Sequence, residues 1–236
     1  KNDNKILIVG NSRSVNLFQA VDANQNLFQG NSFNLLLSKK RLGEDRIECL
    51  HALLIKNYSI CDDSFNYDKD ILKQLNRADT FLLASKWEQH TIDYLEEIIL
   101  ILKNQQKKII LMDMPLILET YGATSMNIFD KFVYENGRLP NNNEVELMEK
   151  KVFLNLRVNK KFAFIDENNK RLKKISDKLE VPLLRSQDYQ CDENLKKCHL
   201  RTPTGYKVYF DNVHSTNEGG EFLGKLFYEK NWDKIN

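Results

Sequence analysis

The chain has 236 residues, of which 35 are basic and 33 acidic, so its formal net charge is only +2. This near balance excludes charge as evidence for a nucleic-acid or strongly acidic partner. With 42% apolar and 10% aromatic residues but only nine Gly and four Pro, the composition predicts a globular protein and excludes a disordered or collagen-like one. The longest apolar run, residues 98–102, is far shorter than the roughly 20 residues that a membrane-spanning helix needs.

Taken in chain order, four short apolar runs predict buried strands at residues 5–9, 80–84, 108–112 and 181–184. Apolar residues at helical spacing predict helices over residues 88–105, 145–156, 172–179 and 222–227. Strands that alternate with helices of this length indicate an α/β fold, a three-layer sandwich with a mostly parallel central sheet flanked by helices.

Other stretches are less informative. Residues 25–70 follow neither the helical nor the strand period clearly, so the order of their elements stays open. The asparagine runs at residues 141–143 and 168–169 are interpreted as loop tips. Because there is no internal repeat and no linker, we expect one domain over residues 1–236.

The start of the chain and its cysteines bear on where the protein works. The first residue is Lys1 and not Met, and no signal segment precedes the first apolar run, so we expect a piece of a longer protein. The cysteines form two close pairs, Cys49 with Cys61 and Cys191 with Cys198, without the CxxC spacing of zinc or redox motifs. An exported, oxidised protein is favoured over four unpaired thiols in the cytosol. The second pair is the firmer prediction, since its short loop would gain about 2.5 kcal/mol in the chain-entropy model.

A serine follows the first predicted strand. Gly10, Asn11 and Ser12 would lie beyond the carboxyl end of that strand, where open parallel sheets build their active sites. At a turn into a helix, Ser12 could be an exposed nucleophile whose own backbone N–H donates to an oxyanion. A helix cap or the remnant of a phosphate loop is the alternative, and no GxGxxG or GxxxxGK[ST] pattern follows to support nucleotide binding.

An acid and a histidine stand three residues apart near the other end of the chain. Asp211 and His214 precede the last predicted helix, and in a turn this spacing lets the carboxylate reach Nδ1–H of the imidazole while Nε2 points toward a third group. A surface turn is the alternative interpretation. The other histidines have no carboxylate so placed and no metal-like clustering, so they are interpreted as solvated or structural and no metal site is predicted: His51, His90 and His199.

Together, these two blocks resemble the first and last blocks of the SGNH hydrolases, a superfamily named for its Ser, Gly, Asn and His blocks. More narrowly, the chain resembles the SGNH domain fused to acyltransferase 3 membrane proteins, over residues 5–228. Residues 82–87 resemble the strand of these domains that ends in small residues, a basic residue and Trp. Cys191 to Cys198 resembles their short cysteine loop, which would precede a final strand at residues 206–210. The resemblance implies an SGNH/flavodoxin-like fold.

The chain departs from the superfamily pattern in three places. Asn11 stands where the first block usually has Asp. The third block normally supplies an Asn as an oxyanion donor from a Gly-x-Asn-Asp run, which is missing here, and losing one such donor costs about 100 to 1000-fold in turnover. The glycine of the second block is unplaced, with Gly30 and Gly43 both possible. The candidates for oxyanion or substrate contacts are Asn11, Gly30, Ser85, Lys86 and Trp87. For Trp87, a sugar-facing wall and a cover for the end of the sheet are both open.

The resemblance implies a function. Ser12 would attack an acetyl carbonyl, His214 would move the proton, and Asp211 would orient the imidazole. The domain would bind no cofactor, since a membrane acyltransferase domain, expected in the same full-length chain, would deliver acetyl groups from acetyl-CoA. The acceptor would be a hydroxyl of a glycan such as an O-antigen, at the periplasmic or extracellular face of a bacterial inner membrane, and no nucleic acid is expected. A stand-alone carbohydrate acetyl esterase and a non-catalytic glycan-binding domain are the alternatives.

Overall fold

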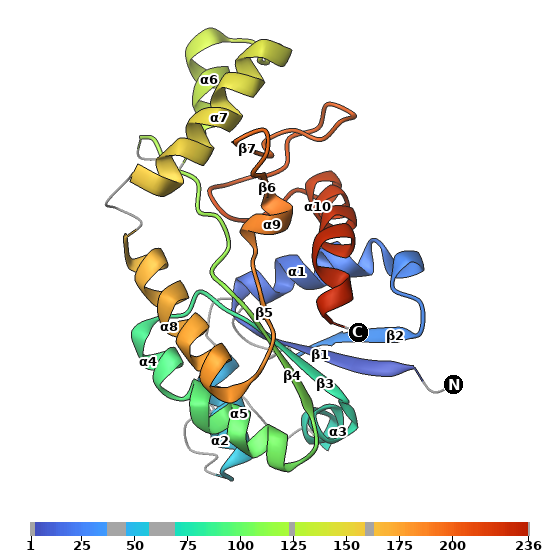
Figure 1. The fold of residues 1–236 in the computed structure, drawn as a ribbon. Helices are drawn as coiled ribbons and strands as arrows, with labels where there is room; N and C mark the ends of the chain where they lie inside the picture. Colours follow the sequence, from blue (N-terminus) through green and yellow to red (C-terminus); the bar gives the residue numbers. More distant parts are fainter. Residues whose placement is uncertain (1–2, 37–45, 57–68, 123–125, 159–162, 236) are drawn as a thin grey trace.

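The computed structural model describes residues 3–36, 46–56, 69–122, 126–158 and 163–235. A five-stranded sheet with the order β2-β1-β3-β4-β5 lies at its centre, and every neighbouring pair is parallel (Figure 1). The strands are β1 (Asn4–Gly10), β2 (Asn31–Leu35), β3 (Thr80–Ala84), β4 (Lys108–Met112) and β5 (Leu183–Leu184). This sheet confirms the predicted fold class.

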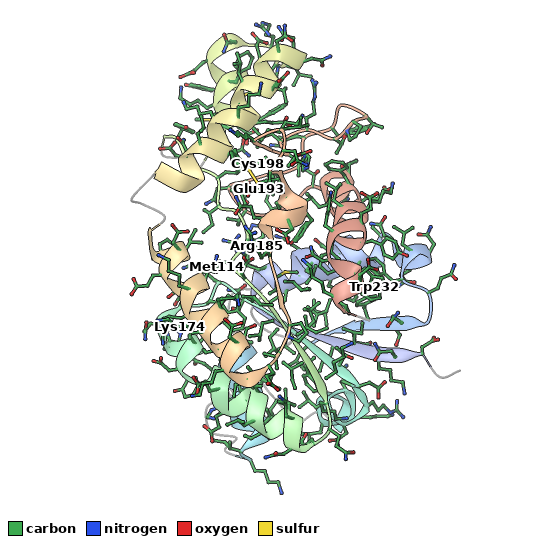
Figure 2. All side chains as sticks on the ribbon, in the orientation of Figure 1. Met114, Lys174, Arg185, Glu193, Cys198 and Trp232 are labelled. Carbon is green, nitrogen blue, oxygen red and sulfur yellow. A yellow bond between two sulfur atoms is a disulfide. The ribbon has the colours of Figure 1, made fainter. Side chains whose placement is uncertain are left out.

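Helices cover both faces of the sheet. On one face lie α1 (Ser12–Asp22) and α10 (Asn217–Asn231), and on the other lie α2 (Arg46–Leu54), α5 (Leu95–Asn104) and α8 (Ala163–Leu179) (Figure 1). Trp232, just after α10, and Lys174, on α8, lie on opposite sides of the sheet in Figure 2. The remaining described α-helices are α3 (Lys69–Arg77), α4 (Gln89–Asp93), α6 (Ile128–Asn136), α7 (Asn142–Val158) and α9 (Gln187–Gln190). None of the helices described is long and apolar enough to cross a bilayer.

Alternation along β1 explains why its sequence is apolar throughout. Successive side chains of a strand point to opposite faces, and here both faces are covered by helices. Ile6 and Ile8 therefore join the core beneath α1 and α10, whereas Leu7 and Val9 join the core beneath α2 and α5. For the same reason β3 and β4 are apolar runs that could be predicted as strands from the sequence. Their side chains are buried on both faces, except for the first residue of β4.

Several sequence predictions need correction. The predicted helix over residues 88–105 is two helices, α4 and α5, which meet at Tyr94. The predicted strand over residues 206–210 is wrong: this segment is a loop, tied by isolated bridges between Arg201 and Lys207 and between Tyr209 and Ser215. The undecided stretch contains β2 and α2.

The predicted loop tip at residues 168–169 is also wrong, because both asparagines lie inside α8. Asn168 Nδ2 donates to the Trp87 carbonyl at 2.6 Å, and Asn169 Oδ1 accepts from the Met114 amide at 2.9 Å. These amides satisfy backbone groups in the loops after β3 and β4, which explains two polar residues within a helix.

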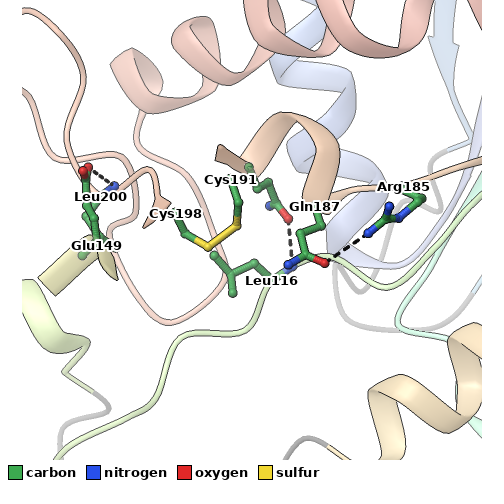
Figure 3. The surroundings of a disulfide bond; sticks show 8 residues. Leu116, Glu149, Arg185, Gln187, Cys191, Cys198 and Leu200 are labelled. Carbon is green, nitrogen blue, oxygen red and sulfur yellow. Dashed lines mark hydrogen bonds between the residues drawn. A yellow bond between two sulfur atoms is a disulfide. The ribbon is translucent and has the colours of Figure 1, made fainter. Parts of the chain in front are cut away.

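The predicted Cys191–Cys198 disulfide is confirmed, with an S–S distance of 2.09 Å (Figure 3). It joins β6 (Cys191–Asp192) and β7 (Lys197–Cys198), which pair in antiparallel fashion. The neighbouring Gln190 Oε1 accepts from the Leu116 amide at 2.8 Å, so the hairpin is fixed to the segment that follows β4. The predicted pair of Cys49 with Cys61 lies outside the described residues, because Cys61 is not among them.

Close packing joins the two ends of the chain. A Cβ atom added to Gly224 of α10 would lie 2.1 Å from the carbonyl oxygen of Ala20 in α1, so only glycine allows the two helices to approach this far. Nearby, Asn24 Nδ2 donates to the Glu221 carbonyl at 3.0 Å. The helix that begins at Ser12 is thereby held against the helix that begins three residues after His214.

Replacing Gly224 by Ala is expected to destabilise the protein by about 1–3 kcal/mol, because the added methyl group must push α10 away from α1. Gly220, one turn earlier in α10, is the matched control, since its added Cβ would meet only Ser215 Oγ at 3.4 Å. Gly220→Ala is expected to be neutral or stabilising by up to about 1 kcal/mol, as in an open helix position. Urea unfolding of both variants checks this. Equal stability of the two variants would contradict the packing argument.

Candidate functional site

Ser12 lies where the sequence predicted, at the first turn beyond the carboxyl end of β1. Asn11 caps α1 by accepting from the Arg13 amide at 3.0 Å through Oδ1, and its carbonyl accepts from Ser14 Oγ at 2.6 Å. Ser12 is the first residue of α1 and is partly exposed. Its hydroxyl and backbone N–H therefore lie at the positive end of the helix dipole, a position that favours negative charge.

The close approach of β1 to β3 explains the glycine before this turn. Gly10 pairs with Ala84, and a Cβ atom added to Gly10 would lie 1.8 Å from the Ala84 carbonyl oxygen. A larger residue would push the two strand ends apart, so glycine at this position keeps the turn that carries Ser12 against the end of β3.

Asp211 and His214 form the predicted acid–imidazole pair. His214 Nδ1 lies 2.6 Å from Asp211 Oδ2, while Oδ1 accepts from the Val213 and His214 amides, both at 2.7 Å. Burial raises the pKa of Asp211, but the hydrogen bonds from His214 and from the Val213 amide outweigh burial, so this pKa lies below its ordinary value. An ionised Asp211 favours the tautomer with a proton on Nδ1, which leaves Nε2 as an acceptor.

Three separate segments hold the loop that carries this pair. Asn16 Nδ2 of α1 donates to the Val213 carbonyl at 3.3 Å, and the Leu118 amide, beyond β4, donates to the Asn212 carbonyl at 2.8 Å. Asn127, the N-cap of α6, donates to the Asp211 carbonyl at 2.9 Å. Sequence reasoning missed Asn16 and Asn127. The position of Asn127 before two apolar residues could have indicated that it caps a helix. Nothing in the sequence around it indicates its hydrogen bond to the Asp211 carbonyl.

The candidate nucleophile and the candidate base thus lie at the same edge of the sheet. Ser12 follows β1, and the loop with Asp211 and His214 is bonded both to α1 and to the segment after β4. Among the described residues no hydrogen bond joins Ser12 to His214, and none of them forms a hydrogen bond with Nε2 of His214. The ring of His214 stacks on Phe210, with centroids 5.5 Å apart and planes 17° apart. Catalytic hydrogen bonds often shorten only when substrate binds, so the triad remains a prediction.

A small cavity of about 30 Å³ lies beneath α1, at the carboxyl ends of β3 and β4, and most of its lining is apolar. Its polar lining residues include Arg13, Ser85, Asp113, Tyr189, Gln190 and Tyr209. Nη1 of Arg13 and the hydroxyl of Tyr209 are buried without a hydrogen-bond partner among the described residues. Burial raises the pKa of Asp113 to about 6, although its Oδ1 accepts from the Ser186 amide at 2.6 Å.

A family model described as the SGNH domain fused to AT3 domains matches residues 1–229. The chain belongs to this family of SGNH domains. Its fold is similar to that of the periplasmic domain of a lipopolysaccharide acetyltransferase from Salmonella ser. Paratyphi A. That comparison gives 17% identity and a TM-score of 0.60, and covers 100% of this chain and 85% of that one.

Two further solved structures are similar to this chain, both with TM-scores below 0.5. A protein described as an acylhydrolase from Bacteroides fragilis gives a TM-score of 0.49 and 12% identity, covering 100% of this chain and 90% of that one. A GDSL-like lipase from Bacteroides thetaiotaomicron gives 0.48 and 11%, with 99% and 89% covered. A comparison with curated proteins gives no match.

Two of the predicted oxyanion or substrate contacts in the SGNH domain need correction. Gly30 precedes β2, and its carbonyl accepts from the Asn4 amide at the amino ends of the strands, so it lies at the opposite edge of the sheet from Ser12. Trp87 is fully buried, and its indole N–H donates to the Met112 carbonyl at 2.6 Å, so it covers the end of the sheet and faces no sugar.

The other predicted contacts stay predictions. Asn11 uses its side-chain oxygen as the cap of α1. Ser85 follows β3 at the correct edge but is buried, and Lys86 forms an ion pair with Glu88 at 2.7 Å. Gly43 lies outside the described residues. Among the residues described, no three His, Cys, Asp or Glu side chains are grouped to hold a metal ion.

Asp113 gives the stability of the SGNH domain a pH dependence. Its pKa is about 6 in the folded domain against an ordinary value of 3.8, so between these pH values the folded state keeps a proton that the unfolded state has lost. The stability from this proton is fully present below about pH 4 and is lost as the pH rises through about 6.

Asp113→Asn is therefore expected to raise the free energy of unfolding at pH 7 by about 1–3 kcal/mol and to flatten its dependence between pH 4 and 6. The amide oxygen of Asn can still accept from the Ser186 amide. Urea unfolding across this pH range measures the effect, with the exposed Asp177→Asn as the charge-matched control. An unchanged slope in Asp113→Asn would disprove this assignment.

Proposed function

We propose that this SGNH domain transfers acetyl groups to hydroxyls of a cell-envelope glycan through an acetyl-Ser12 intermediate. The observation that carries the proposal is the 2.6 Å hydrogen bond between Asp211 and His214, at the sheet edge where Ser12 begins α1. A base oriented by a carboxylate near a serine at a helix N-terminus is the arrangement that acyl transfer needs.

The proposed reaction has two halves. In the first, Ser12 Oγ attacks the carbonyl carbon of the acetyl donor and gives its proton to Nε2 of His214. The oxyanion collapses, the bond to the donor's leaving group breaks, and His214 returns the proton to that group. In the second, a glycan hydroxyl attacks acetyl-Ser12, loses its proton to His214, and leaves as the acetyl ester, while Ser12 regains its proton. Activity falls in acid because a protonated imidazole cannot accept the serine proton.

The family supports the proposed partners. Its model describes SGNH domains fused to AT3 domains, which supports a membrane acyltransferase domain in the same full-length chain. The similar Salmonella structure is the periplasmic domain of a lipopolysaccharide acetyltransferase. We infer that this domain likewise works on the periplasmic or outer side of the membrane, with acetyl groups that originate from acetyl-CoA and a surface polysaccharide such as an O-antigen as acceptor.

Ser12→Ala is expected to abolish both acetyl transfer and aryl-acetate hydrolysis without unfolding the domain. A fluorophosphonate probe with mass spectrometry measures this directly, because it should label Ser12 in the parent and nothing in the variant. Ser14→Ala is the matched control on the same turn. Its buried hydroxyl is bonded to the Asn11 carbonyl, so the variant should keep the label while losing about 1 kcal/mol of stability. Full activity of Ser12→Ala would overturn the proposed nucleophile.

Transfer and hydrolysis are separated by their products. With an acetyl donor and a glycan acceptor, the proposed transferase should form more acetylated glycan than free acetate, because the bound hydroxyl competes with water. Acetate as the sole product, unaffected by acceptor, would favour the esterase. A folded parent that neither turns over acetyl esters nor reacts with the probe would favour a non-catalytic glycan-binding domain.

A further inference from the structure

Arg13, the residue after the candidate nucleophile, is partly exposed but has a buried Nη1 atom, and the reaction described above does not use its charge. Its side chain turns inward from the first turn of α1 and lines the cavity at the ends of β3 and β4. Within the described part of the chain it forms no side-chain hydrogen bond and no ion pair, and its Nη1 is shielded from solvent. Burial lowers the pKa of Arg13 to about 10, partly offset by attraction to Asp211, so the guanidinium is still charged at neutral pH.

Such a residue lowers the stability of the folded state. A partly buried cation loses part of its hydration, and without a hydrogen-bonded carboxylate it recovers little of that loss. Polar groups that destabilise the fold are found mostly at functional sites, where they contribute to binding or catalysis. Arg13 lies at such a place, because one neighbour along the chain is Ser12 and the opposite charge that acts on it is Asp211.

The groups around the guanidinium come from three parts of the chain. Asp211 and Tyr209 belong to the loop before α10, Tyr189 belongs to α9, and Asp113 follows β4. Burial raises the pKa of both tyrosines, so they stay neutral, and Asp113 makes its hydrogen bond to Ser186 and not to Arg13. Among these groups, Asp211 is the carboxylate whose charge acts most strongly on Arg13.

We propose that Arg13 is an electrostatic positioning residue of the acyl-transfer site, whose partly buried charge stabilises the negative charge that forms when Ser12 attacks the carbonyl group. It acts through space and through Asp211, in a medium of low dielectric constant where such attraction is stronger than in water. This inference rests on the proposed function. It also offers a source of oxyanion stabilisation in a chain that lacks the Gly-x-Asn-Asp run.

The test compares Arg13→Met, Arg13→Gln and Arg13→Lys with the parent domain, using the rate of fluorophosphonate labelling and the pH profile of aryl-acetate hydrolysis. Arg77→Met, at the exposed end of α3 near the amino edge of the sheet, removes the same charge and is the control. We expect Arg13→Met and Arg13→Gln to be at least as resistant to urea as the parent, yet at least tenfold slower. Arg13→Lys should stay within about threefold of the parent rate.

The pH profile distinguishes an electrostatic role from a structural one. Removing a nearby cation favours the uptake of a proton by the site, so the acid limb of the profile should move to higher pH in Arg13→Met and stay in place in Arg77→Met. Parent rates and an unmoved profile in either neutral variant would overturn the proposal. So would a folded Arg13→Lys as slow as the neutral variants, even if Arg13→Met failed to fold. A parent that fails to react at all refutes the proposed function instead, since the Arg13 comparison needs an active parent.

Discussion

The approach of α10 to α1 at Gly224 and Ala20 is the constraint on which the rest of the site depends. The candidate nucleophile begins one of these helices, and the loop with the candidate base leads into the other. The two segments are separated by almost the whole sequence, so their meeting must come from tertiary packing. A glycine at the point of contact lets the backbones approach closely, and Asn24 and Asn16 add hydrogen bonds across the same junction.

The sequence predicted the elements whose pattern is set locally. β1, β3 and β4 are buried on both faces, so each is an uninterrupted apolar run. The Asp211–His214 pair was also predictable, because a spacing of three residues in a turn lets the two side chains meet. The disulfide belongs to the same class, since Cys191 and Cys198 are joined by a short hairpin.

The elements that were missed depend on distant contacts. β2 is an edge strand with Asn31, Ser32 and Asn34 along it, so it carries no apolar run to recognise. From its small and charged neighbours in the sequence, Trp87 could have been an exposed residue that contacts a sugar. In the structure its indole N–H donates to the carbonyl of Met112, 25 residues away. Gly30 is close to the candidate block in sequence, yet the parallel return of the chain puts it at the other edge. No pattern of neighbouring residues in the sequence predicts contacts of this kind.

The disulfide hairpin connects the redox state of Cys191 and Cys198 to the position of the loop that carries His214. Gln190, next to the bridge, holds the Leu116 amide, and two residues later the Leu118 amide holds Asn212, between the acid and the histidine. The position of the loop that carries His214 therefore depends in part on a disulfide bond that forms after synthesis. In a chain made under reducing conditions this bond would not form, and the contacts that hold the loop would lose its support.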